Sequence, residues 1–524
     1  MPLLPCRSPH WGLSRLVLAL ALMLPGGCRA ADGPAWLPPP PLADPLHPPV
    51  PPAPPVSAAD PVLLVALAAR LGPAGGGADA EARPLRLRAA SGLLRLIDAD
   101  GGRYMAPELV LHWQRLPLPQ PLLWRRRVAG PFASFESAER AAELWRAAGA
   151  DRLAIAHPRD WEVWAPAGAP ELVEVPSRPM EGQETDALVL QLRRADGPVT
   201  LRGPLRIEAA GGLAWGDGVY AGPFRLQPDA HGGWTLVEEV PLERYLAGVV
   251  PHEIGAGAPA AALQAQAVLA RTWALRNRHR FAVDGYHLCA DTQCQVYSDP
   301  RQAGPAALAA IKASQFRVLT WQRRPIHAVY HASNGGVAAG FPEVWNGTPL
   351  PYLRPAADGP AAFTAGLPLP LAPAALGRLL AGGGDAYGAD HPLFRWERRL
   401  TADGVAQALA KAGGVGSVRA LVVGERGPSG RVLSLVIRGS AGEKVLRLDA
   451  IRRTLRNLPS TLFTLTPDGA GAWRVRGGGF GHGAGLSQAG AIDLARRGWS
   501  TERILRHYYP GTQLDSLGAL EDAP

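Results

Sequence analysis

The stretch VPLERYLAGVVPHEIGAGAPAAALQAQAVLARTWAL, residues 240–275, contains the clearest helical pattern of the chain and an isolated carboxylate just before it. Apolar side chains recur at helical spacing and predict a helix over residues 258–278, with one stripe formed by Leu263, Ala267, Ala270 and Ala274. Pro259 suits the first turn of this helix. Gln266 and Arg271 fall off this stripe.

Glu253 lies between Pro251 and a glycine-rich approach to this helix. Rigid and flexible backbone on its two sides can present one carboxylate to a cleft, although a lone Glu near a helix start is more often a capping or solvated residue. The dipole of the following helix would favour the ionised carboxylate. An acid role for Glu253 therefore requires burial that outweighs the dipole.

The segment YHLCADTQCQVYSDP, residues 286–300, brings two cysteines and a histidine together. Cys289 and Cys294, with His287 beside them, offer at most three of the four ligands of a structural zinc site. We expect a disulfide between the two cysteines instead, because an exported protein usually oxidises a close pair.

Two later segments also carry polar side chains next to glycine. IHAVYHASNGG, residues 326–336, delivers Tyr330, His331 and Ser333 to a turn, as a binding wall with the nearby Trp345 and Tyr352 or as a packed strand end. WRVRGGGFGHGAGLSQAGAIDLARRG, residues 473–498, predicts a strand, alternate glycines around His482 and a helix.

The glycine run does not match the dinucleotide-binding pattern G-x-G-x-x-G, and too little chain follows for the rest of such a fold. We expect its glycines to let main chain approach a bulky ligand closely. The sequence has no H-E-x-x-H, G-x-S-x-G or G-x-x-x-x-G-K-[ST] motif, which excludes the common metalloprotease, esterase and phosphate-loop patterns.

The N-terminus has the pattern of an export signal, which we assign to residues 1–30. Arg7 and Arg15 precede an apolar run over residues 16–24, too short to span a bilayer. Cleavage after Ala30 and lipidation of Cys28 are both compatible with the sequence. We expect an exported protein of the periplasm or cell wall, with no integral membrane domain.

Between this signal and the helix, the chain divides by composition. Residues 31–61 are a proline-rich linker and should form an extended spacer. Residues 84–123 predict short strands of a β-rich lead-in. Residues 124–166 predict a small α+β region with a helix that begins after Ser134, followed by further strands from 185 to 240.

The small α+β region faintly resembles the SPOR domain, a peptidoglycan-binding module, but only about one strand-helix-strand unit is visible, which favours a generic α+β lead-in. In the second half, residues 360–415 have the composition of an insertion, and ALVVGERGPSGRVLSLVIRG predicts two strands joined by a turn. The net charge of +9 favours polyanionic surroundings but does not separate nucleic acid, anionic lipid and wall polymers.

Taken together, the motifs resemble the SpoIID/LytB family. The matching stretches lie in the family's order over residues 190–514, and they are VPLERYLAGVVPHEI, ALQAQAVLARTWAL, CQVYSD, YHASNGG with VWNG and PYL, GPSGRVLSLVIRG, LPSTLF, GGGFGHGAGLSQAGA and HYYPGT. The resemblance implies an α+β fold with a β-rich, multi-part SpoIID-like catalytic domain and a few helices over residues 185–515.

The resemblance also implies an activity, that of a lytic transglycosylase which cuts glycan strands stripped of their peptides and leaves 1,6-anhydro-muramic acid ends. The family's catalytic glutamate falls on Glu253. Other positions in matching motifs are candidates for lining the substrate groove: Gln266, Arg271, Gln295, Tyr297, Tyr330, His331, Ser333, His482 and Gln488.

A non-catalytic enhancer of an N-acetylmuramoyl-L-alanine amidase is the alternative function that the resemblance offers. The expected partners are peptidoglycan glycan strands and a cell-wall amidase, not nucleic acid. No cofactor is required. Zinc is doubtful, because family members that bind it have Thr-His-Cys-Gln where this chain has Gln293 between Thr292 and Cys294. Val337 and Ala338 also stand where the family often has a threonine.

Overall fold

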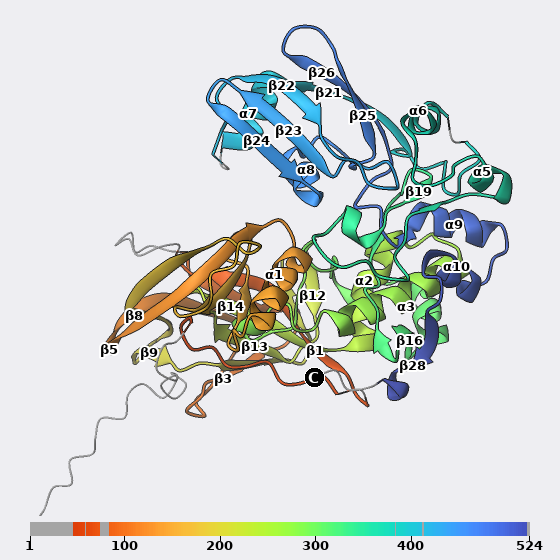
Figure 1. Cartoon of the computed structure of the whole chain (residues 1–524). Helices are drawn as coiled ribbons and strands as arrows, with labels where there is room; N and C mark the ends of the chain where they lie inside the picture. Colours follow the sequence, from red (N-terminus) through yellow and green to blue (C-terminus); the bar gives the residue numbers. More distant parts are fainter. Residues whose placement is uncertain (1–45, 58, 74–82, 383, 411–412, 521–524) are drawn as a thin grey trace, which may run out of the picture.

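The computed structural model describes residues 46–57, 59–73, 83–382, 384–410 and 413–520. Strands and helices are mixed along the chain, so the expected α+β class is confirmed. Two large sheets and a helical layer form the body of the molecule. A second lobe, built from residues of the C-terminal half and called the upper lobe below, lies above the body in Figure 1. The predicted signal segment and Cys28 lie outside the described residues.

The first large sheet has the strand order β15-β1-β14-β13-β10-β3-β4. These strands are β1 (Val62–Leu71), β3 (Leu94–Ile97), β4 (Arg103–Ala106), β10 (Leu205–Ala209), β13 (Phe224–Pro228), β14 (Trp234–Pro241) and β15 (Leu288–Cys289). Strand β3 pairs with β10, and Leu94 and Leu205 are both fully buried in one core with the helices that follow β14. The predicted lead-in over residues 84–123 therefore packs into the main body.

The second sheet has the order β12-β11-β2-β5-β7-β6, and β8 joins β5 to β9. Its strands are β2 (Leu85–Ala89), β5 (Glu108–Phe132), β6 (Ala154–Ala156), β7 (Trp161–Pro166), β8 (Ser177–Arg194), β9 (Gly197–Leu201), β11 (Leu213–Trp215) and β12 (Gly218–Tyr220). Because β5 is one strand of 25 residues, it runs through the boundary that we predicted between residues 123 and 124.

The helix predicted after Ser134 is present as α1 (Phe135–Ala147), and the Ser134 side chain caps it by accepting a hydrogen bond from the Ser137 N–H. Buried Ala138, Ala142 and Trp145 hold α1 against the second sheet. The strand-helix-strand pattern is thus correct, but its first strand is shared with the rest of the sheet.

The described part of the proline-rich segment, residues 46–57, does not stand away from the body. The Leu46 carbonyl accepts a hydrogen bond from Arg126 Nη1 at 2.6 Å, and the Pro54 carbonyl contacts His287 Nε2 at 2.9 Å. An extended proline-rich chain leaves its carbonyls unpaired, so they are available to such donors. For these residues the expected free spacer is wrong.

The helical layer follows β14 and is formed by α2 (Leu242–Ile254), α3 (Ala260–Arg276), α4 (Pro305–Ala313), α9 (Gln488–Arg496) and α10 (Thr501–Tyr508). Short strands border it: β16 (Arg317–Trp321), β17 (Arg324–Pro325) and β28 (Gln513–Ser516) form one sheet, and β18 (Tyr330–His331) pairs with β27 (Leu486–Ser487). Helix α3 is buried almost all round, and Gln266 and Arg271 are 0% exposed. The single-stripe pattern therefore underestimates its burial.

The upper lobe contains two three-stranded sheets, β21-β26-β25 and β22-β23-β24. The strands are β21 (Arg395–Thr401), β22 (Val418–Val423), β23 (Ser434–Gly439), β24 (Gly442–Arg447), β25 (Phe463–Pro467) and β26 (Ala472–Gly478). Helices α7 (Ala402–Leu409) and α8 (Asp449–Thr454) pack with them. Strand β19 (Val337–Ala338), which pairs with β20 (Ala356–Ala357), and helices α5 (Ala361–Ala365) and α6 (Pro373–Ala381) lie on the β25 side of the lobe (Figure 1).

The hairpin predicted for ALVVGERGPSGRVLSLVIRG is β22 and β23. The second half of the predicted insertion, β21 and α7, contributes Trp396 and Val405 to the core of the upper lobe. Single-turn helices complete the described chain: η1 (Ala282–Asp284), η2 (Pro300–Gln302), η3 (Phe341–Glu343) and η5 (Leu517–Ala519). No helix among the described residues is both long enough and apolar enough to cross a membrane.

Candidate active site

Glu253 lies in the last turn of α2, one residue before the helix ends at Ile254. Gly255 follows with φ of 87°, a conformation that glycine adopts without strain and that ends the helix. Our expectation of a carboxylate at a helix start was wrong, because the helical pattern was recognised only from residue 258 onwards. At a C-terminus the dipole disfavours a negative charge, which is the direction that an acid needs.

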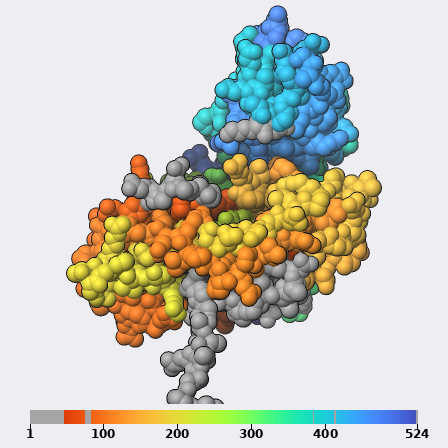
Figure 2. All heavy atoms as spheres, turned by 90° about the vertical axis from the view of Figure 1, so that its left-hand side faces the viewer, coloured from red at the N-terminus to blue at the C-terminus, as the bar shows by residue number. Residues whose placement is uncertain are grey.

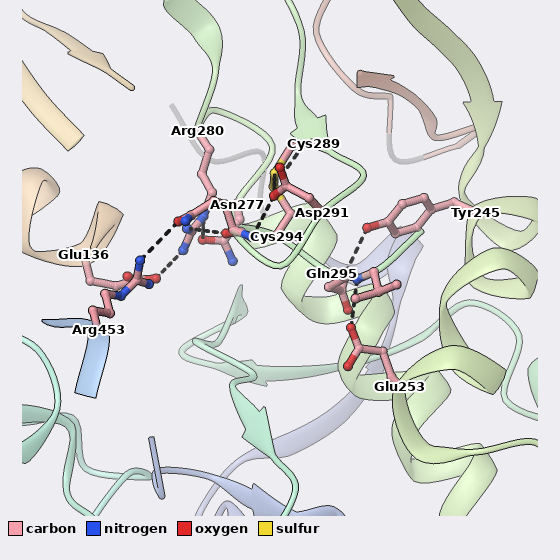
Figure 3. The surroundings of a disulfide bond; sticks show 12 residues. Glu136, Tyr245, Glu253, Asn277, Arg280, Cys289, Asp291, Cys294, Gln295 and Arg453 are labelled. Atoms are coloured by element: carbon pink, nitrogen blue, oxygen red, sulfur yellow. Dashed lines mark hydrogen bonds and ion pairs between the residues drawn. A yellow bond between two sulfur atoms is a disulfide. The ribbon is translucent and has the colours of Figure 1, made fainter. Parts of the chain in front are cut away.

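Two neighbours contact the Glu253 carboxylate. The Val296 N–H donates to Glu253 Oε1 at 2.9 Å, and the Tyr330 hydroxyl also lies within hydrogen-bonding reach of the carboxylate. The Tyr330 hydroxyl donates to Gln295 Oε1 at 2.9 Å, so its one proton can serve either Gln295 or the Glu253 carboxylate. Gln295 Nε2 donates to the Tyr245 hydroxyl at 3.2 Å (Figure 3). A buried chain of hydrogen bonds thus fixes the groups beside the carboxylate.

Burial raises the pKa of Glu253 above its ordinary value, and the hydrogen bonds from Val296 and Tyr330 offset this only in part. Among the described residues, Glu253 has no ion-pair partner. The carboxyl group therefore keeps its proton to a higher pH than an exposed glutamate would.

Glu253 opens onto a cavity of about 250 Å³ that three carboxylates line. Glu136 is paired with Arg280. Asp449 is paired with Arg452 at 3.1 Å and Arg453 at 2.7 Å. Although burial alone would raise it, the two arginines hold the pKa of Asp449 below its usual range. Glu253 is thus the carboxylate of this cavity that is suited to carry a transferable proton.

Three of the other predicted groove residues line the same cavity: Gln295, Tyr330 and His482. His482 Nε2 contacts the Tyr330 carbonyl at 2.8 Å, and its Nδ1 accepts from the Ala484 N–H at 3.1 Å. Burial lowers the pKa of His482 to about 4, so the ring is neutral at pH 7. It acts on its surroundings as a positioned, uncharged ring.

Six predicted groove residues do not line this cavity: Gln266, Arg271, Tyr297, His331, Ser333 and Gln488. Arg271 makes two hydrogen bonds to Glu243, at 2.7 and 2.8 Å, and a third to the Arg317 carbonyl. Gln266 and Gln488 bond to each other at 3.3 Å. These three side chains connect elements of the core, because α3 is buried along most of its surface.

The remaining three also bond within the protein. The Tyr297 hydroxyl donates to Glu238 Oε2 at 2.8 Å, and His331 Nδ1 contacts the Ala484 carbonyl at 3.0 Å. Ser333 pairs through its backbone with Phe480. Trp345 lines the cavity as expected for a binding wall, whereas Tyr352 packs against Trp321 with ring centroids 6.0 Å apart.

The glycines around His482 have positive φ, but two of them pack against other residues of the protein and not against an open groove. A Cβ on Gly481 would lie 2.8 Å from His331 Cβ, and one on Gly483 would lie 2.2 Å from Arg431 Nη2. The expectation that these glycines make room for a bulky ligand was therefore wrong at both positions. The missing side chain of Gly481 lets the segment pass close to His331, and that of Gly483 leaves room for the Arg431 guanidinium.

Sequence reasoning missed several cavity residues, which come from distant parts of the chain: Phe135, Glu136, Trp273, Arg280, Asp449, Arg452 and Arg453. Phe135 and Glu136 begin α1, within the region that faintly resembles a SPOR domain. Trp273 lies in the recognised helix motif and could have been selected as an aromatic cavity residue. The others carry no local signal, because only folding brings them to Glu253.

Cys289 and Cys294 form a disulfide (Figure 3). Both ring nitrogens of the neighbouring His287 are engaged, Nδ1 by the Leu64 N–H at 2.8 Å and Nε2 by the Pro54 carbonyl at 2.9 Å. With no thiolate, no free imidazole nitrogen and Gln293 in place of a histidine, these residues do not fit a zinc ion.

Comparison with known proteins agrees with this arrangement. The family model for Stage II sporulation protein matches residues 230–321, which include Glu253, and a model described as a domain of unknown function (DUF8618) matches residues 339–485. Stage II sporulation protein D of Bacillus subtilis (strain 168) is 29% identical over 299 residues, which cover 54% of this chain and 77% of the relative.

Stage II sporulation protein D of Bacillus amyloliquefaciens is 30% identical over 298 residues, covering 53% of this chain and 75% of the relative. The amidase enhancer of Bacillus subtilis (strain 168) is 28% identical over 304 residues, covering 52% of this chain and 40% of the relative. These matches support a cell-wall-related role. The chain belongs to the SpoIID/LytB family.

Proposed function

We propose that this protein is an exported lytic transglycosylase that cleaves peptidoglycan glycan strands, with Glu253 as its acid and base. The observation that carries the proposal is the unpaired, partly buried Glu253 in a cavity whose other carboxylates are held by arginines. Its raised pKa favours the protonated form that must begin the reaction.

The proposed reaction needs one carboxyl group. Glu253 protonates the glycosidic oxygen, and the bond between this oxygen and C1 of muramic acid breaks as positive charge develops at C1. The C6 hydroxyl of the same sugar then attacks C1 and gives its proton to the Glu253 carboxylate, which restores the acid. Ordinary glycosidases use a second carboxylate to handle water or to act as nucleophile. An internal hydroxyl makes that second group unnecessary.

The neighbours of Glu253 have positioning roles in this proposal. The Val296 N–H holds Oε1 and directs the other carboxylate oxygen to the cavity, while Gln295 fixes the Tyr330 hydroxyl. Trp273 and Trp345 supply aromatic surface for sugar rings. No step requires a metal ion.

Digestion of purified, peptide-free glycan strands tests the proposal. The products should end in 1,6-anhydro-muramic acid and be one water lighter than hydrolysis products, which mass spectrometry distinguishes. Reducing ends would instead indicate a hydrolase and contradict the single-carboxylate mechanism.

We predict that kcat/KM falls as the pH rises through the pKa of Glu253, at a pH above the ordinary glutamate pKa, since only the protonated group can start the reaction. The Tyr330 hydroxyl lowers the pKa of Glu253. Tyr330→Phe should therefore move this alkaline limb to higher pH. Tyr352→Phe, outside the cavity, is the matched control and should leave the limb in place. If the alkaline limb stays at the same pH in Tyr330→Phe, the pH dependence of kcat/KM does not report the titration of Glu253.

We also predict that the disulfide positions the site, because Cys294 lies two residues before the Val296 donor. Replacing both cysteines by serine should lower the free energy of unfolding by about 2 kcal/mol, the value for closing a loop this short. The cleavage rate should fall several-fold. Dithiothreitol should reproduce the loss in the native protein and have no effect on the double variant. Full cleavage activity in both the serine double variant and the dithiothreitol-treated native protein would show that the disulfide does not position the site.

The match to an amidase enhancer favours a second candidate function. As a non-catalytic enhancer, the protein would bind strands without cutting them and would raise the rate of a cell-wall amidase added to the same sacculi. Cleavage of glycan strands by this protein without an amidase would favour the lytic transglycosylase over the enhancer.

A further inference from the structure

A second and larger cavity, of about 1030 Å³, continues from the Glu253 cavity between the body and the upper lobe. Both cavities are lined by Thr292, Gln293, Arg452 and Arg453, which therefore form their junction. One wall comes from residues 131–133 and 159–160 of the body, and the other comes from the upper lobe. Figure 2 shows the upper lobe facing the α1 region across this boundary.

This inter-lobe cleft is strongly basic. Seven of its lining residues are Arg or Lys and one, Asp160, is acidic. The whole chain of 524 residues has a net charge of only +9. Positive charge is thus concentrated beside the site rather than spread over the surface, which favours an anionic occupant.

Arg452 and Arg453 stand at the junction and share one carboxylate, Asp449, so the group keeps one unit of positive charge. Their side chains are 28% and 38% exposed, which leaves donors accessible from the cavities. Arg453 Nη1 also lies 3.5 Å from Gln293 Oε1 on the body. Asp449 orients the two guanidinium groups without neutralising both.

The geometry points to a specificity role for this cleft, and the inference rests on the proposed function. We propose that the glycan strand continues from Glu253 into the inter-lobe cleft, where Arg452 and Arg453 bind carboxylate groups of its muramic acid residues. A muramic acid without its peptide carries a free carboxylate, whereas an attached peptide turns that group into a neutral amide. A guanidinium recognises a carboxylate through paired, charge-assisted hydrogen bonds.

On the body's side of the cleft, residues 131–133 and 159–160 lie outside both ranges that the family models match, whereas Thr292 and Gln293 lie inside the first. On this side Arg159 supplies a positive charge next to Asp160, and the residues before α1 supply uncharged surface. In this proposal the small α+β region acts as a wall of the catalytic cleft, attached to the body by the buried ion pair between Glu136 and Arg280.

Binding of fluorescent peptide-free strands to the full chain tests this, measured in the Glu253→Gln background so that cleavage does not interfere. The ligands are the native strands, strands whose carboxyl groups have been converted to methylamides, and a glycerol phosphate polymer. Arg452→Gln with Arg453→Gln should weaken binding of native strands about tenfold and leave the weaker methylamide binding unchanged. Salt should weaken only the binding of the charged strands.

A matched control uses Arg474→Gln with Arg476→Gln. These arginines also share one carboxylate, Glu397, in the same lobe, but they do not line the cleft. Because the first double variant leaves Asp449 without partners, a second one, Arg159→Gln with Arg456→Gln, tests the cleft with that ion pair intact. It should weaken binding in the same selective way.

Three outcomes would overturn the inference: equal binding of native and methylamide strands, equal losses in the control variant, or equally tight binding of the phosphate polymer, which would indicate a general polyanion surface. Cleavage is measured separately with Glu253 present. Selective binding without any cleavage would refute the proposed activity and leave the cleft assignment standing, so the two failures are distinguishable.

Discussion

Replacing Glu253 by Gln should lower the rate of strand cleavage by roughly 10² to 10⁴-fold, the usual contribution of acid-base catalysis. The amide keeps the size of the carboxyl group and can still accept the Val296 N–H, but it cannot deliver a proton. The thermal unfolding midpoint and the affinity for strands should stay close to those of the native protein. Release of anhydro-ended fragments, followed by mass spectrometry, measures the effect.

Glu502→Gln is a suitable control, since this exposed glutamate lies on α10, outside the cavity. It should cleave at the native rate. Undiminished cleavage by Glu253→Gln would show that another group is the acid. No cleavage by the native protein would favour the amidase-enhancer function instead.

Replacing Arg271 by Ala should lower the free energy of unfolding by about 3 kcal/mol, the lower end of the range for breaking a buried ion pair. Arg271 is fully buried, whereas Glu243 is 23% exposed, so water can relieve part of the cost. The change also removes the donor to the Arg317 carbonyl. Urea unfolding followed by circular dichroism measures the loss.

The double variant Arg271→Met with Glu243→Gln should recover part of this stability, because it leaves no unpaired charge in the core. Cleavage by the Arg271 variants should follow their folded fraction. If Arg271→Ala is stable but no longer binds glycan strands, Arg271 lines the substrate groove as the resemblance implied.

The sequence predicted the elements whose signals are local. The helix α1 was recognised from the Ser134 cap and its apolar spacing, and the hairpin of β22 and β23 from two apolar runs around a turn. The resemblance selected Glu253, but its place in a helix was misjudged, because Pro251 and the glycines after it obscure the end of α2.

The cavity around Glu253 was predicted only in part, for a physical reason. Motif matching identifies positions, and it does not distinguish a side chain that reaches the cavity, such as Tyr330, from one that closes the core, such as Arg271. The arginines at 280, 452 and 453 reach the site through tertiary packing of α1 and α8, which leaves no trace in local spacing.

The burial of most of the surface of α3 affects which substitutions this chain can accept during evolution. A helix with a solvent face tolerates drift on that face, but α3 packs against α2, α4, α9, α10 and β16. A larger or smaller side chain at Ala267 or Ala270, both fully buried, must be matched by a compensating substitution in a neighbouring element. Among related sequences, covariation between α3 and its neighbours would therefore indicate that the fold is kept. Whether the reaction is kept would be judged from the residue at position 253.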